Sequence, residues 1–149
     1  MKKVSVVLSL VVLSFLFAGC PSPSTDLNPD IGVLSPDENA VYYIYDTYQD
    51  IATLKADLTD DIGLEVVTIG VYNSDDESVF FDRIFINDGD PDTTEVKSFM
   101  VTRTFQTNIP GIYKVKFTLT DLAAQQVTET LFIEFVEVGP GDGDTDGPT

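Results

Sequence analysis

The sequence predicts an all-β antiparallel sandwich of seven or eight strands, and three observations lead to this fold class. Between residues 31 and 138 the chain consists of short segments in which apolar and polar residues alternate, as on half-buried strands. Clusters of Gly, Pro, Asn, Asp and Ser separate these segments. No connection is long enough to hold a helical crossover, so we expect neighbouring strands to pair antiparallel.

The first half of this region is expected to contain four strands, over residues 31–34, 41–45, 51–58 and 64–72. Ser35-Pro36 stops the first, because proline cannot donate a ladder hydrogen bond. The second is rich in tyrosine and suits either a short strand or a strand-like loop. The third and fourth alternate clearly, and the side chains expected on one face are Ala52, Leu54, Ala56, Leu58, Val67, Ile69 and Val71.

The second half predicts four more strands, over residues 79–86, 96–105, 112–120 and 126–136. The register of the first is ambiguous, since either Phe80 or Phe81 could face the core. In the other three, the side chains expected to face inward are Phe99, Val101, Phe105, Tyr113, Val115, Phe117, Leu119, Val127, Leu131, Ile133 and Phe135.

Two stretches resemble motifs of bacterial immunoglobulin-like domains, a superfamily that includes cadherin-like and PKD-like modules. Residues 60–69 read DDIGLEVVTI, similar to the D-D-x-G-L-x-x-V-x-I that joins the second and third strands of such domains. Residues 111–121 run from Gly-Ile-Tyr-Lys-Val to Thr-Asp, similar to their G-x-Y-x-V…T-D strand. The resemblance implies an immunoglobulin-like sandwich over residues 31–138, in which Tyr113 buries its ring and bonds backbone at a strand corner. After Asp121 the chain reads Leu-Ala-Ala-Gln where many relatives have Gly-Asn, so a different turn is expected.

The N-terminus has the pattern of a bacterial lipoprotein signal peptide. Lys2 and Lys3 precede an apolar run that ends in Phe17-Ala18-Gly19-Cys20, which resembles a lipobox. We therefore expect residues 1–19 to be removed and Cys20 to carry lipid, which would hold the protein to a membrane. The alternative is a retained anchor helix, but the run is shorter than the roughly 20 residues that span a bilayer.

The segments on either side of the domain favour a location in the bacterial cell envelope. Residues 20–30 are rich in Pro and Ser and suit a flexible tether, and residues 139–149 are an acidic Gly/Asp tail expected to be disordered. Pro21 stands where lipoproteins retained in the inner membrane of enteric bacteria carry Asp, so the resemblance favours the outer membrane or cell surface.

Charge and residue types exclude several functions. The formal net charge of −17 opposes binding to nucleic acid, because the phosphate backbone repels it. The chain has no His and one Cys, the predicted lipid acceptor, so a zinc site and His- or Cys-based catalysis are not expected. We therefore expect a protein that is not an enzyme.

Carboxylates offer the candidate metal ligands. Asp88, Asp90 and Asp92 alternate in one loop and could converge on calcium, which accepts oxygen ligands in flexible geometry. Asp60 and Asp61 lie in a predicted turn at which the resemblance to cadherin-like modules implies calcium binding, and Asp121 lies in a turn at the same or the opposite end. The alternatives are a solvated acidic loop and carboxylates that bond nearby backbone N–H groups.

A tyrosine cluster is the second candidate for a binding surface. Tyr42, Tyr43, Tyr45 and Tyr48 could stack on sugar rings or anchor a protein contact, or they could fill one end of the core. The sequence thus predicts a lipid-anchored, non-catalytic module that contacts a surface protein or glycan. The alternative is a calcium-stabilised, cadherin-like structural spacer.

Overall fold

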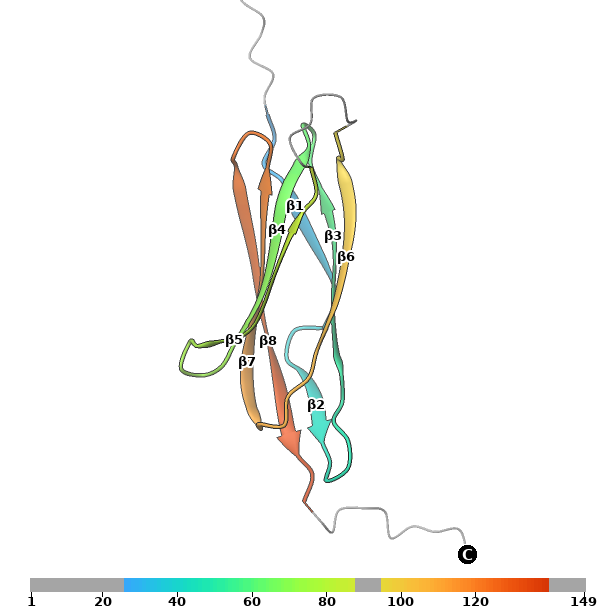
Figure 1. Cartoon of the computed structure of the whole chain (residues 1–149), viewed down its shortest axis with the longest axis vertical. Helices are drawn as coiled ribbons and strands as arrows, with labels where there is room; N and C mark the ends of the chain where they lie inside the picture. The colour runs from blue at the N-terminus through green and yellow to red at the C-terminus, as the bar shows by residue number, and fades with distance from the viewer. Residues whose placement is uncertain (1–25, 88–94, 140–149) are drawn as a thin grey trace, which may run out of the picture.

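The computed structural model describes residues 26–87 and 95–139, and this part of the chain is an all-β immunoglobulin-like sandwich (Figure 1). It contains eight strands and no helix. The strands are β1 Asp30–Ser35, β2 Ala40–Ile44, β3 Ala52–Thr59, β4 Leu64–Tyr72, β5 Ser78–Phe85, β6 Ser98–Phe105, β7 Gly111–Asp121 and β8 Gln126–Glu137. The fold class predicted from the alternating pattern is confirmed.

The strands form two sheets that face each other. The smaller sheet has the order β1-β3-β6, and the larger has the order β2-β8-β7-β4-β5. β5 is therefore an edge strand of the larger sheet.

One pairing contradicts the expectation that all neighbours are antiparallel. β2 runs parallel to β8, with Tyr42 opposite Phe135. The expectation was wrong here because the chain does not cross over within one sheet. It leaves β1 in the small sheet and enters β2 at the edge of the large one, and a short link suffices for that transfer. In this link the Asn39 N–H donates to the Phe132 carbonyl at 2.8 Å, which holds the start of β2 against β8.

Alternate side chains of both sheets build a single core. The inward positions predicted for β3, β4 and β7 are fully or almost fully buried. Phe80 packs against this core and Phe81 faces outward, which settles the register of β5. The largest fully buried side chains are Phe117, Phe135, Leu54, Leu58, Leu64, Ile69, Leu119 and Ile133.

Tyr113 adopts the predicted corner arrangement. Its ring is buried between those of Phe105 and Phe135, with centroids 5.5 and 5.7 Å away. Its hydroxyl donates to the Ile109 carbonyl at 2.7 Å. The bond ties the β6–β7 connection to the start of β7.

The described chain enters and leaves the sandwich at opposite ends (Figure 1). Residue 26 lies at one end, together with the β3–β4 and β7–β8 turns, and we call this the tether end. The ends of β2 and β8 lie at the other, the far end, where the Val138 N–H donates to the Ile44 carbonyl at 2.9 Å. Within the described residues no helix is long and apolar enough to cross a membrane. The predicted signal peptide, Cys20 and most of the predicted tail lie outside these residues.

Candidate metal centre

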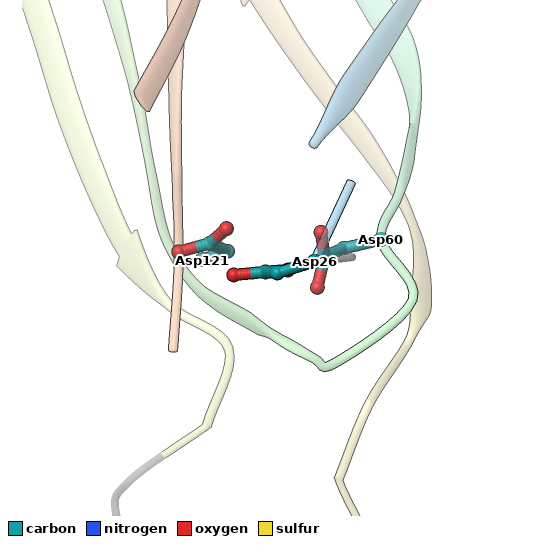
Figure 2. A group of neighbouring side chains, drawn as sticks. All are labelled: Asp26, Asp60 and Asp121. Carbon is teal, nitrogen blue, oxygen red and sulfur yellow. The ribbon is translucent and has the colours of Figure 1, made fainter. Parts of the chain in front are cut away.

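Three aspartates from distant parts of the chain meet at the tether end. Asp26 precedes β1, Asp60 directly follows β3, and Asp121 is the last residue of β7. One carboxylate oxygen from each lies within 4.8 Å of the other two. Figure 2 shows the three side chains turned toward a common point. We call these three residues the aspartate cluster.

The β3–β4 turn fixes Asp60. Its Oδ2 accepts hydrogen bonds from the N–H groups of Ile62 at 2.8 Å and Gly63 at 2.6 Å, which is the turn chemistry expected of an aspartate here. This arrangement occupies only one of the two carboxylate oxygens. Asp60 Oδ1 has no hydrogen-bond partner among the described residues.

The β7–β8 turn fixes Asp121 in the same way. Asp121 is fully buried, and its Oδ1 accepts from the Gln125 N–H at 2.7 Å. The Leu122 N–H donates to the Gly63 carbonyl at 2.9 Å, which joins this turn to the β3–β4 turn. A Cβ at Gly63 would lie 2.8 Å from Leu122 Cδ1, so glycine permits this close approach.

The segment before β1 is attached to both turns. The Gln125 side-chain amide donates to Asp26 Oδ2, and the Leu27 N–H donates to Asp61 Oδ1 at 3.3 Å. Asp26 lies in the predicted tether, but it contacts residues at the end of the domain. The tether and the sandwich therefore form one structure at this point.

The cluster leaves three buried oxygens without hydrogen-bond partners, namely Asp26 Oδ1, Asp60 Oδ1 and Asp121 Oδ2. Buried carboxylate oxygens are normally paired, because removing them from water is costly. No ion pair within the described residues neutralises these carboxylates. The nearby Lys97 instead donates to the Asp61 carbonyl at 2.5 Å. The cluster thus brings three carboxylates close together and leaves one buried oxygen of each without a hydrogen-bond partner.

A hard cation fits this donor set. Calcium binds carboxylate oxygens at about 2.3–2.6 Å, so two ligands on opposite sides of one ion are separated by about 4.8 Å. One carboxylate oxygen from each of the three aspartates lies within that limit of the other two. An all-oxygen anionic set favours calcium or magnesium over metals that prefer nitrogen or sulfur.

The negative charges of the aspartate cluster act on Asp26. Burial raises the pKa of the Asp26 carboxyl, and the negative charges of Asp121, Asp61 and Asp60 raise it further. The amide of Gln125 opposes this shift by donating to the carboxylate. A bound cation would offset the repulsion between these carboxylates.

The structure brings together only part of the predicted ligand set. Asp60 belongs to the aspartate cluster, whereas Asp61 is exposed and outside it. Asp88, Asp90 and Asp92 lie outside the described residues. Sequence reasoning missed Asp26, which it assigned to the tether, and left open the end at which Asp121 lies. The structure places Asp121 at the same end as Asp60.

The four tyrosines divide into two groups. Tyr42 stacks on Phe135 with centroids 5.2 Å apart and packs against the core, and burial together with the charges of Asp37 and Asp50 raises its pKa. Tyr45 and Tyr48 stack on each other at 4.2 Å, with Tyr43 6.2 Å from Tyr45. Tyr43 and Tyr48 are 43% and 57% exposed. These three rings lie at the far end, away from the aspartate cluster.

Comparison with known proteins gives one fold-level likeness to report. No family model matches the chain, and no curated protein matches it. Among solved structures, the chain is similar to the CARDB domain of a Pyrococcus furiosus protein, crystallised in complex with di-metal ions. The match has 13% identity and a TM-score of 0.45, and it covers 79% of this chain and 100% of that domain.

Proposed function

We propose that this chain is a lipid-anchored, non-catalytic module of the bacterial cell envelope, in which a calcium ion fastens the tether to the immunoglobulin-like domain. The observation that carries the proposal is the set of three buried, unpartnered oxygens of Asp26, Asp60 and Asp121. Each comes from a different segment, and one of those segments is the tether. A cation held there would be bonded to the tether and to both turns of the domain.

Calcium suits this site better than magnesium. Calcium accepts irregular oxygen geometries and completes its coordination with water, whereas magnesium demands a near-ideal octahedron. Extracellular modules commonly bind calcium in the range of about 10⁻⁴ to 10⁻³ M, which is weak enough for a site with three protein carboxylates. Asp121 is the ligand most dependent on an ion, because it is fully buried.

The position of the site gives the cation its function. Cys20, the predicted lipid acceptor, lies only a short stretch before Asp26. A bound ion would therefore shorten the free part of the tether and fix the direction in which the domain extends from the membrane. The module then acts as a calcium-stiffened spacer with its far end presented outward.

A second candidate function is contact with a surface protein or glycan. The stacked pair of Tyr45 and Tyr48, with the exposed Tyr43 beside it, favours it because these rings lie at the far end. Aromatic rings with polar tips are enriched at binding surfaces. The two functions are compatible, since a spacer would present this cluster away from the membrane.

The test is thermal unfolding of the mature chain with Cys20→Ser, in excess EDTA, in millimolar Ca²⁺ and in millimolar Mg²⁺. Binding to the folded state alone stabilises it by about 1.4 kcal/mol at ten times the Kd, which raises the Tm by a few degrees. We expect Asp121→Asn to abolish this rise and the neighbouring Asp61→Asn to preserve most of it. Identical unfolding curves in EDTA and Ca²⁺ would refute calcium fastening.

Lipid attachment is tested separately in cells. The full-length protein should take up radiolabelled palmitate and partition into detergent, and Cys20→Ser should do neither. A Cys20→Ser protein that remains membrane-bound would instead indicate a retained anchor helix.

A further inference from the structure

The outer face of the large sheet differs in character from the rest of this acidic molecule. On β5, on β7 and on β4 after Glu65, the outward positions that the structure describes carry no carboxylate, whereas Glu65 lies at the start of β4 and Glu134 of β8 lies opposite Ile112. They carry aromatic, aliphatic and basic side chains instead. We call the following residues the basic aromatic face: Tyr72, Phe81, Arg83, Phe85, Ile112, Lys114 and Lys116.

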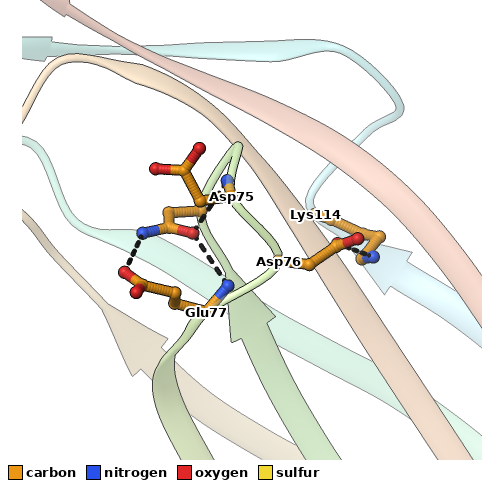
Figure 3. A network of polar contacts seen from close by, with 5 residues as sticks. Asp75, Asp76, Glu77 and Lys114 are labelled. Atoms are coloured by element: carbon orange, nitrogen blue, oxygen red, sulfur yellow. Dashed lines mark hydrogen bonds and ion pairs between the residues drawn. The ribbon is translucent and has the colours of Figure 1, made fainter.

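Two of the basic side chains of this face make cation–π contacts with its aromatic rings. The Arg83 guanidinium carbon lies 5.0 Å from the centre of the Phe85 ring, and the Lys114 ammonium lies 5.3 Å from that of Tyr72. Lys114 also forms an ion pair with Asp76 in the β4–β5 connection (Figure 3). Within the described residues Arg83 and Lys116 form no ion pair. Two of the three charges are thus available to a partner.

A glycine at the centre of the face leaves room for the Tyr72 ring. Gly70 lies between Phe81 on β5 and Lys116 on β7 in the sheet register. The Tyr72 ring covers the position that a Cβ of Gly70 would occupy, at 2.7 Å. Phe81 lies opposite Gly70 and is 61% exposed.

β5 also presents an unpaired backbone edge. It pairs with β4 and with no other strand of the described chain. Phe81 and Phe85 on this edge strand are 61% and 66% exposed. Its inward charge, Asp82, is already paired with Arg103 of β6. An exposed edge with apolar side chains can recruit an added strand.

We propose that β5 and the basic aromatic face bind an acidic, extended segment of a partner protein, which adds a strand to the large sheet. Main-chain hydrogen bonds to the free edge of β5 would supply affinity, and Arg83 and Lys116 would select for carboxylates. Screening at physiological salt acts over about 8 Å, so the local positive charge governs a bound segment more than the net charge of −17 does. A second copy is disfavoured as the occupant, because two such molecules repel each other.

The probe is a short labelled peptide in which Glu alternates with Val and Thr, titrated into the mature Cys20→Ser chain and followed by fluorescence anisotropy. We expect binding that weakens with salt and that slows hydrogen exchange of the β5 amides. The double variant Arg83→Glu/Lys116→Glu should weaken it at least tenfold. Lys55→Glu on β3, in the other sheet, is the matched control and should leave it unchanged.

Several outcomes would overturn this proposal. They are absence of binding at millimolar peptide, equal binding of a peptide with Lys in place of Glu, and unchanged affinity in the double variant. Binding of an anionic oligogalacturonate without protection of β5 amides would make the face a glycan site instead. Dimerisation through β5 in the absence of peptide would make a second copy the occupant. Circular dichroism of each variant confirms that it folds.

Discussion

The Leu122 N–H donates to the Gly63 carbonyl across 2.9 Å, and this bond holds the β7–β8 turn against the β3–β4 turn. The two carboxylates that follow β3 and end β7 are neighbours because of it. Asp60 and Asp121 are thus placed by a contact between turns.

Gly63→Ala should separate these turns. The new Cβ would lie 2.8 Å from Leu122 Cδ1 and 3.3 Å from Glu95 Cβ, so the Leu122 side chain must move, and the φ of 157° at this position is one that L residues rarely adopt. We expect a loss of about 1–3 kcal/mol in the free energy of unfolding, measured by urea denaturation in EDTA. Calcium stabilisation should also fall, because Asp60 and Asp121 move apart. Gly111→Ala is the control. Gly111 has a φ of 150°, and a Cβ added there meets no atom within 4 Å, so this variant measures the cost of an L residue at positive φ without a side-chain clash.

Asp26→Asn should have opposite effects with and without calcium. In EDTA it removes one of three mutually repelling charges, and we expect the Tm to rise by a few degrees. In millimolar Ca²⁺ it removes a ligand, so the variant should melt below the wild type. Differential scanning fluorimetry of the variant and the wild type in both buffers measures whether the order of their Tm values reverses. A variant whose Tm is higher than that of the wild type in both buffers, or lower in both, would contradict a cation site at Asp26.

The apo protein should show a matching pH dependence. The folded-state pKa of Asp26 is raised above its ordinary value of 3.8, so folding favours its protonated form. This favourable contribution is fully present below the unfolded pKa and is lost as the pH rises through the folded pKa. The Tm difference between Asp26→Asn and wild type in EDTA should therefore be largest near neutral pH and shrink as the pH is lowered toward 4. A difference that is constant over this range would exclude titration of Asp26 as its cause.

Tyr113→Phe isolates the corner hydrogen bond. It removes the donor to the Ile109 carbonyl and leaves the buried ring in place. We expect a loss of about 0.5–1.5 kcal/mol in unfolding free energy, without a change in calcium stabilisation, since the site lies at the other end. Chemical denaturation with and without Ca²⁺ tests both parts. A loss that exceeds this range would mean that the ring also repacks.

Local pattern predicted the strands well because each strand buries one face. The alternation in residues 51–58 and 112–120 needed no knowledge of partners. The register of β5 was ambiguous because Phe80 and Phe81 are adjacent and equally apolar. The structure resolves it through the pairing of β5 with β4, where Phe81 lies opposite Gly70.

Features that depend on distant segments were not predictable in this way. The parallel pairing of β2 with β8 joins residues 40–44 to residues 133–137, which are far apart in the sequence. Asp26 resembles the rest of a polar tether, and only its contact with the distant Gln125 places it in the aspartate cluster. Asp60 could be proposed because its turn was visible in the sequence. Its partners could not be found from local spacing.

The arrangement of the terminal strands has a mechanical consequence. The described chain starts at one end of the sandwich and stops at the other, and the edge strand β2 runs parallel to β8. A pull on the two ends of the described chain would act first on β1, which pairs with β3, and would then load the ladder between β2 and β8 in shear. Bonds loaded this way share the force and break together, whereas an unzipped hairpin breaks them one at a time. We therefore expect the ladder between β2 and β8 to resist such a pull more strongly than a hairpin opened from its end.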